Sequence, residues 1–336
     1  MRFSPRHVAT VLAVLLAALA LALGHAQDVG RRSHSHRRHH DRAVVPPAAP
    51  IAGAVPRLRV TFMAVGQGDG ALLESADGHS AMIDTGPPEA SDHVRQTLAS
   101  HRITRLDWVL FTHPHLDHIG SGRAVLEAVR VDRVVDPAYP HPIATYDRLL
   151  ERIQQLGISF APARTGMTLA LGADVRVDVL LPHEPFIDDT RSDVNSNSIV
   201  ARVGTGSVHV LFTGDAEVET EQRLLSESRA QLSAEVLKVA HHGSRYASSD
   251  AFLDAVGARV GVISCGPGND YGHPHEATLR ALGRRGVAVH RTDVEGDVTV
   301  DTNGNTVNVH VQQPADANAL LAPGVRARDA TEDSAP

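Results

Sequence analysis

The chain contains a single cysteine, Cys265, among its 336 residues. A lone cysteine cannot form an intramolecular disulfide, so stability must come from a packed core or from bound metal. No cysteine lies directly after the apolar stretch near the N-terminus, so we expect no bacterial lipoprotein anchor. We expect Cys265 to be a small buried side chain.

Long hydrophobic runs are equally scarce, because the sequence has just one, from Val8 to Leu23. It follows Arg2 and Arg6 and precedes Gly24-His25-Ala26, which has small residues where a signal peptidase recognises its substrate. We therefore predict a signal peptide at residues 1–26 and export to the periplasm or the exterior. The run falls short of the roughly 20 residues that span a bilayer, so we expect no stable membrane insertion after cleavage. An uncleaved anchor is the alternative.

Excess positive charge is missing from most of the chain. The formal net charge is −7, and because residues 1–42 are basic, residues 43–336 carry −12. Such an acidic body is not built for tight, sequence-independent DNA binding, which depends on phosphate neutralisation by Lys and Arg. The His/Arg-rich segment 31–42 and the Pro/Ala-rich segment after it predict a disordered linker at residues 27–56. Its four histidines leave loose metal binding as an alternative to a simple solvated linker.

What the sequence does contain is a dense group of metal-binding residue types at residues 112–120, THPHLDHIG. The apolar run 108–111 before it is typical of a buried strand. Pro114 excludes a regular helix through the group, so we expect the ligands on a strand-to-loop turn. Imidazole and carboxylate groups suit zinc, iron and manganese, and their density favours two ions. The candidate ligands are His113, His115, Asp117 and His118, and a surface loop without function is the alternative.

Three other predicted strands also end in polar side chains. Strand 81–83 runs into Asp84, strand 208–212 is followed by Asp215, and strand 236–240 by His241 and His242. Asp84 is a candidate to hold a ligand histidine through its second ring nitrogen, or simply to cap a turn. The glycine-rich segment 65–70, VGQGDG, is expected to let the backbone approach a neighbouring group closely.

The alternation of β and α segments predicts one α/β domain at residues 57–312, with helices covering the sheets and a disordered tail at 313–336. Within it, the segment 193–198, DVNSNS, offers amides and hydroxyls that suit oxyanions, with Asn195 and Ser198 as candidate substrate contacts. A polar turn is the alternative for that segment. A second loop rich in hydrogen-bond donors spans residues 266–275 and contains Tyr271 and His273.

Seven short motifs resemble the metallo-β-lactamase superfamily, and within it the hydrolase domain of the ComEC/Rec2 competence proteins. They are VGQGD at 65–69, IDTG at 83–86, THPHLDHIG at 112–120, TGDAE at 213–217, KVAHHGS at 238–244, NDYGHP at 269–274 and RTD at 291–293. The resemblance covers residues 57–311 and implies a single-domain αββα sandwich with metal ions at one edge, where the strand-end loops meet.

The resemblance also implies a ligand set. By analogy, His113 and His115 hold the first ion, Asp117 and His118 hold the second, and Asp215 bridges the two. His241 or His242 completes the second site, and we prefer His242 because the superfamily commonly has glycine directly after this ligand. The third histidine that lactamases use at the first site is replaced here within residues 195–198, as in the ComEC-like branch, which counts against a β-lactamase.

Two departures from that branch limit the analogy. Ala64 stands where ComEC-like domains usually have aspartate, and the sequence has no membrane-channel portion, so we do not expect DNA transport from this chain alone.

These observations predict an exported phosphodiesterase of nuclease type, with two divalent ions that activate a water for attack on DNA or another phosphodiester. Zinc is the expected metal and manganese the alternative. We assign Asp117 and Asp215 to the chemistry, and Tyr271 and His273 to substrate contact or protonation of the leaving group. The alternatives are hydrolysis of a lactone, thioester or cell-wall phosphoester, and a non-catalytic metal-binding protein.

Overall fold

The computed structural model describes residues 56–324, which belong to one compact unit, Pro50–Pro336. The predicted signal peptide and nearly all of the predicted linker lie outside the described residues. Within residues 56–324, no helix combines the length and the apolar character that crossing a membrane requires.

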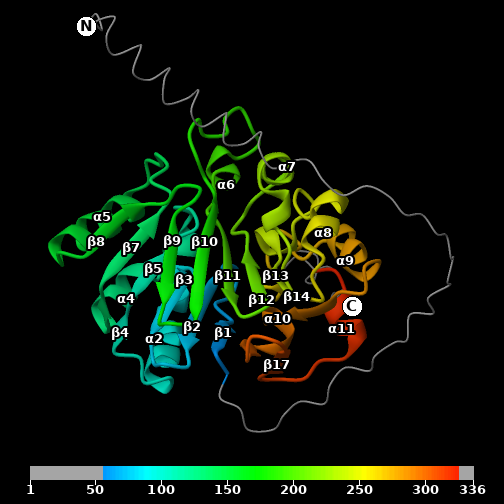
Figure 1. The fold of residues 1–336 in the computed structure, drawn as a ribbon, viewed down its shortest axis with the longest axis horizontal. Helices are drawn as coiled ribbons and strands as arrows, with labels where there is room; N and C mark the ends of the chain where they lie inside the picture. Colours follow the sequence, from blue (N-terminus) through cyan, green and yellow to red (C-terminus); the bar gives the residue numbers. More distant parts are fainter. Residues whose placement is uncertain (1–55, 325–336) are drawn as a thin grey trace, which may run out of the picture. The chain divides into compact units, whose positions relative to one another are not determined.

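Two β-sheets form the centre of this unit (Figure 1). The order in the eight-stranded sheet is β17 (Val307–Val311), β16 (Val298–Thr302), β1 (Leu58–Phe62), β2 (Gly70–Ser75), β3 (Ser80–Thr85), β5 (Trp108–Leu110), β7 (Arg133–Asp136) and β8 (Ser159–Pro162). The order in the seven-stranded sheet is β15 (Ala288–Arg291), β14 (Val260–Ile263), β13 (Val236–Lys238), β12 (Val208–Phe212), β11 (Val200–Thr205), β10 (Val175–Leu181) and β9 (Thr168–Leu171). A small parallel pair, β4 (Arg105–Leu106) and β6 (Arg130–Val131), lies apart.

Alternating apolar side chains place one hydrophobic core between the two sheets. On β1, Leu58, Val60 and Phe62 enter this core, and the rings of Phe62 and Phe212 stack with centroids 5.6 Å apart. Neighbouring positions such as Leu72 and Leu211 point to the outer faces instead, as the two-residue period of a strand requires.

Helices cover both outer faces (Figure 1). The eight-stranded sheet packs against α2 (Ser91–Ser100), α4 (Gly122–Ala128) and α5 (Ala144–Gln155), and the seven-stranded sheet against α7 (Val218–Glu227), α8 (Asp250–Val256) and α9 (Glu276–Gly283). The shorter helices are α3 (Leu116–Ile119), α6 (Asp193–Ser196), α10 (Thr292–Glu295) and α11 (Ala317–Leu321), with 3-10 turns η1 (Pro88–Ala90), η2 (Arg229–Gln231) and η3 (Ala240–Gly243). The four layers confirm the predicted αββα sandwich.

The chain remains structured beyond the predicted end of the domain at residue 312. Helix α11 lies in the segment that we expected to be a disordered tail. The buried Arg291 guanidinium donates hydrogen bonds to the carbonyls of Ala319, Leu320 and Ala322, which holds this segment against the domain. The Pro/Ala-rich composition of the tail gave no sign of this anchor.

Candidate metal centre

The loop after β5 carries the first group of candidate ligands, as the sequence predicts, but half of the group is helical. His113 lies in the turn, and His115 is the N-cap of the four-residue helix α3, which contains Asp117 and His118. Pro114 precedes the N-cap, where a proline removes no helical hydrogen bond, so a helix can start directly after it. The expectation of a strand-to-loop turn is therefore wrong for Asp117 and His118.

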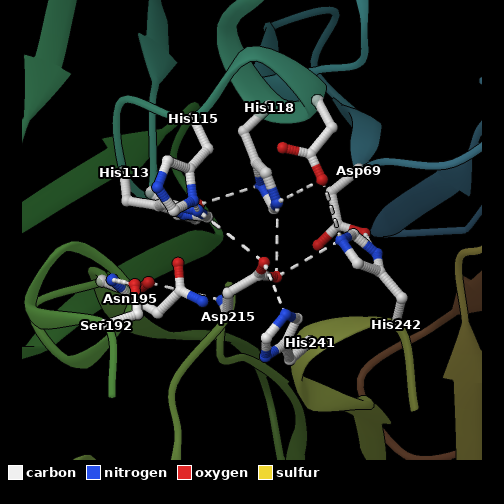
Figure 2. A network of polar contacts seen from close by, with 12 residues as sticks. Asp69, His113, His115, His118, Ser192, Asn195, Asp215, His241 and His242 are labelled. Carbon is white, nitrogen blue, oxygen red and sulfur yellow. Dashed lines mark hydrogen bonds and ion pairs between the residues drawn. The ribbon is translucent and has the colours of Figure 1, made fainter. Parts of the chain in front are cut away.

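The carboxylate of Asp215, which follows β12, lies at the centre of the site (Figure 2). Its Oδ1 is 3.3 Å from His118 Nε2 and 3.5 Å from His242 Nε2, and its Oδ2 is 3.7 Å from His113 Nε2. Asp215 is 2% exposed and therefore shielded from solvent. The two oxygens of this one buried carboxylate thus face imidazoles from the loop after β5 and from the segment after β13.

The ligand atoms fall into two overlapping groups that share Asp215. One group is Asp117, His118, Asp215 and His242, and the other is His113, His115 and Asp215, with the ligand atoms of each group within 4.8 Å of one another. His118 Nε2 and Asp215 Oδ1 are buried and have no hydrogen-bond partner. Buried polar atoms without a partner are costly, and a bound divalent cation would supply the missing partner. The donor set therefore fits two divalent ions with mixed nitrogen and oxygen ligands.

A second carboxylate, that of Asp84, orients His118 by contacting the ring nitrogen that faces away from the centre of the site. Asp84 Oδ2 lies 2.8 Å from His118 Nδ1, while the Thr112 backbone N–H and hydroxyl each donate to Asp84 at 2.7 Å. The ring therefore turns Nε2 towards the centre of the site. This is the contact that the sequence led us to expect for Asp84.

His242 is oriented in a similar way by groups that the sequence analysis did not assign. Its Nδ1 lies 2.9 Å from the Ser264 carbonyl and 3.3 Å from Asp69 Oδ1, and Asp69 also pairs with the Lys238 ammonium at 2.7 Å. The sequence did point to Asp69 and Lys238, because they belong to motifs that carry the family resemblance, VGQGD and KVAHHGS.

The glycine-rich motif brings its backbone close to the ligand loop, as predicted. Gly68 has φ +149°, and a Cβ at this position would lie 2.3 Å from the Asp117 carbonyl oxygen. The neighbouring Asp69 N–H donates to that same carbonyl at 3.2 Å. A side chain at residue 68 would therefore push the two loops apart.

The buried charges act strongly on one another. Burial alone would lower the pKa of His118 and of His242, but Asp215 and the other nearby carboxylates raise the pKa of both imidazoles well above its usual value. For His113 burial dominates, with help from the His118 charge, and its pKa is well below its usual value. Burial opposes ionisation of Asp215, yet the surrounding imidazoles hold its pKa well below the usual range. A cation bound between these groups would compete with protons for the two imidazoles.

His241 and His242 differ in what they face, although both adopt positive φ, 48° and 54°. His242 Nε2 is 3.2 Å from Asp117 Oδ2 and belongs to the group with Asp117, His118 and Asp215. His241 Nε2 is 3.7 Å from Asp215 Oδ2, and its Nδ1 is 3.0 Å from the buried carboxylate of Glu217. This geometry is consistent with our preference for His242 as the ligand of the second ion.

A cavity of about 350 Å³ opens onto this centre. It is lined by Gln67, His115, Leu116, Asp117, Asn195, Asp215, His241, His242, Tyr271 and His273. Tyr271 is 60% exposed and stacks on His273 with ring centroids 5.5 Å apart. Asn195 also lines the cavity, and its buried Oδ1 has no hydrogen-bond partner.

Of the predicted substrate contacts, Ser198 differs from expectation and His273 does not. Ser198 does not line the cavity, because it is fully buried and its hydroxyl accepts a hydrogen bond from the Asp215 N–H at 3.3 Å. The sequence shows that this segment is polar but not which way each side chain faces. His273 does line the cavity as expected, and burial and the neighbouring histidines lower its pKa to about 3.

Comparison with known proteins gives consistent matches. Residues 63–266 match the family described as the metallo-beta-lactamase superfamily. The chain is 30% identical over 223 residues to ComE operon protein 3 of Bacillus subtilis, covering 66% of this chain and 28% of that protein. It is also 30% identical over 239 residues to competence protein ComA of Neisseria gonorrhoeae, covering 70% and 31% respectively.

These matches concern only part of each relative, because the chain spans less than a third of the length of these two proteins. Among solved structures, CmlA, a diiron beta-hydroxylase from Streptomyces venezuelae, is similar with a TM-score of 0.49 and 14% identity, covering 74% of this chain and 55% of that one. So distant a likeness supports no conclusion about the reaction.

Proposed function

The chain belongs to the metallo-β-lactamase superfamily, and from that premise we propose that it is a two-metal phosphodiesterase that cleaves nucleic acid outside the cytoplasm. The observation that carries the proposal is the position of Asp215, a buried carboxylate shared by two ligand groups at the floor of an open cavity. Paired divalent ions suit phosphodiester cleavage, because they neutralise the phosphate and lower the pKa of an attacking water.

In this proposal each residue of the centre has a role. His113 and His115 would hold the first ion, Asp117, His118 and His242 would hold the second, and Asp215 would serve both. The first ion then has fewer protein ligands than the second, and we expect it to bind more weakly. Zinc is our first expectation and manganese our second, because both accept imidazole and carboxylate ligands.

The chain's own groups position the substrate. Asp117 is one-third exposed at the cavity wall, so its carboxylate faces both the ligand groups and the open space where a nucleophile would lie. Asn195 supplies an unpartnered amide oxygen, and Tyr271 a solvent-exposed ring at the rim. Leu116, which also lines the cavity and is exposed, offers an apolar contact.

Two further considerations support a nucleic-acid substrate outside the cytoplasm. The two relatives are named as a ComE operon protein and a competence protein, and we carry only that general association to this chain. The predicted signal peptide at residues 1–26 supports export. Any activity that the chain shares with these much longer relatives belongs to the same proposal.

The test is hydrolysis of bis(p-nitrophenyl) phosphate and of plasmid DNA by the purified protein with zinc or manganese. We expect cleavage of both, with a loss of at least about 100-fold in Asp117→Ala because a ligand and a group beside the nucleophile are removed together. Metal content is measured in parallel, so that loss of the second ion is distinguished from misfolding.

Other outcomes point elsewhere. Cleavage of the small diester without DNA would indicate a cell-wall phosphoester or another small substrate. Absence of both activities in protein that holds two ions would refute the proposal and turn attention to lactone or thioester hydrolysis, or to metal storage.

A further inference from the structure

A second cavity, of about 290 Å³, lies beside the metal centre and has no role in the proposed chemistry. Arg191, Glu217, Glu219, Arg245 and Tyr246 are among the residues that line it. Glu217 connects the two cavities, because its carboxylate is 3.0 Å from His241 Nδ1 and 3.5 Å from Asn195 Nδ2, and both of these residues line the metal cavity. The two cavities are therefore neighbours on either side of the Glu217 carboxylate.

The cavity contains an exposed aromatic ring with two guanidinium groups near it. Tyr246 is 46% exposed, with the Arg191 guanidinium carbon 3.9 Å and the Arg245 guanidinium carbon 5.8 Å from its ring centroid. Arg191 is held by Glu217 at 2.5 Å. Arg245 has no carboxylate partner within residues 56–324, so its charge is available to an anion. An exposed ring next to a free guanidinium is the combination that binds a nucleobase and its phosphate.

The segment that carries Tyr246 is firmly held, although the ring itself is exposed. The buried Glu221 carboxylate accepts hydrogen bonds from the backbone N–H groups of Ser248 and Ser249. The Val218 N–H donates to the Tyr246 carbonyl at 3.2 Å. A rigid aromatic platform loses little conformational freedom when a ligand binds, which favours affinity.

The acidic group in the cavity argues against a site for a simple anion. Glu219 lines the cavity, and its carboxylate forms no ion pair within residues 56–324, so it can accept a hydrogen bond from a ligand. Adenine, cytosine and guanine carry amino groups on their edges that can donate to a carboxylate, whereas inorganic phosphate would be repelled. The lining therefore offers an aromatic face, a carboxylate acceptor and a free cation.

We infer that this cavity is a nucleotide subsite, in which Tyr246 stacks on an unpaired base of the strand whose phosphodiester lies at the metal centre. Glu219 accepts an amino group of that base, and Arg245 contacts the flanking phosphate. The inference rests on the proposed function and narrows its substrate to single-stranded nucleic acid. A paired base is already stacked within the duplex and cannot present its face to Tyr246.

Binding of two labelled 12-mers of equal charge tests this subsite. One is single-stranded DNA of mixed A, C and G, the other has the same backbone without bases, and both carry phosphorothioate linkages that resist cleavage. We expect the metal-loaded wild-type protein to bind the base-containing strand more tightly, and Tyr246→Ala to weaken that binding roughly 5- to 150-fold. Tyr246→Ala should bind the abasic strand as the wild type does, and Tyr246→Phe should retain most of the affinity because the ring remains.

The matched control is Phe160→Ala, which removes another exposed ring, on β8 of the other sheet, and should change neither affinity. The subsite is wrong if Tyr246→Ala retains the difference between the two strands, or if it weakens both equally, which would indicate a backbone contact only.

Failure of the subsite and failure of the proposed function remain distinguishable, because binding is measured without turnover. Tyr246-dependent base binding in a protein that cleaves no DNA would support the subsite and refute the nuclease. Cleavage of single-stranded DNA with the same kcat/KM in the wild type and Tyr246→Ala would support the nuclease and refute the subsite.

Discussion

Among single residues, Asp136 at the end of β7 is a buried carboxyl outside the metal centre. Its Oδ1 accepts hydrogen bonds from the Tyr146 hydroxyl at 2.6 Å and from the Ala138 N–H at 2.7 Å, while its Oδ2 is buried without a partner. Burial raises the pKa of Asp136 to about 6, although both hydrogen bonds act in the opposite direction. The folded protein therefore holds this carboxyl in its neutral form at mildly acidic pH.

Asp136→Asn is expected to change how stability depends on pH. A pKa that folding raises contributes stability that is fully present below about pH 4 and is lost as pH rises through about 6, by at most about 3 kcal/mol. The asparagine does not titrate and keeps an oxygen for Tyr146 and Ala138. Urea unfolding at several pH values should show the stability of wild type relative to the variant falling between pH 4 and pH 7.

An exposed carboxylate provides the control for this measurement. Asp174→Asn changes the same group on the surface, and its stability relative to wild type should stay nearly constant over the same range. A difference between wild type and Asp136→Asn that does not vary with pH would show that Asp136 is not held neutral by the fold.

At the scale of helices and strands, the metal centre depends on where strands end. Asp84 near the end of β3 accepts hydrogen bonds from Thr112 after β5 and contacts His118 on α3, so one carboxylate joins three elements. Asp84 has φ 55°, a left-handed conformation that asparagine tolerates far better than most side chains. Asn is therefore the substitution that preserves the backbone and changes the acceptor.

Asp84→Asn should weaken metal binding by roughly 10- to 100-fold, the usual effect of removing the group that orients a ligand. The asparagine has one acceptor oxygen where Asp84 uses both, so either Thr112 or His118 loses its partner. Competition with a chromophoric chelator measures the affinity for zinc. Asp107→Asn, which alters a surface carboxylate paired with His79, is the matched control and should bind zinc as the wild type does. Equal affinity in both variants would mean that His118 needs no such support.

The sequence predicted these elements well where a local pattern determines them. The strand leading to His113 and the turn after β12 follow from apolar runs that end in polar residues. It failed where orientation or distant contacts decide the outcome. Ser198 points beneath Asp215 rather than into the cavity, and α11 is ordered by Arg291 from another part of the chain. Neither contact leaves a periodic trace in the sequence.

Across the whole described unit, one buried ion pair joins the two sheets beneath the metal centre. Lys238, the only lysine in the chain, lies on β13 of one sheet, and Asp69 directly precedes β2 of the other. Their charged atoms are 2.7 Å apart, and both residues are buried. Burial opposes ionisation of Asp69, but the Lys238 and His242 charges lower its pKa to about 2. The sequence shows that Lys238 is the only lysine, but it does not predict the ion pair with Asp69, because the two residues are far apart in the chain.

Lys238→Met should therefore lower the free energy of unfolding by about 3–5 kcal/mol, because it leaves the Asp69 carboxylate buried without its cation. The double variant Lys238→Met/Asp69→Asn should recover part of this loss, since the second change removes the isolated charge. The matched control is Arg59→Met, which breaks the partly exposed Arg59–Asp301 pair between β1 and β16 and should cost less than about 1 kcal/mol. Urea unfolding of metal-free protein separates this effect from loss of ions. If Lys238→Met costs no more than Arg59→Met, the sheets are held by their apolar core alone, and the pair beneath the metal centre serves only to orient His242 through Asp69.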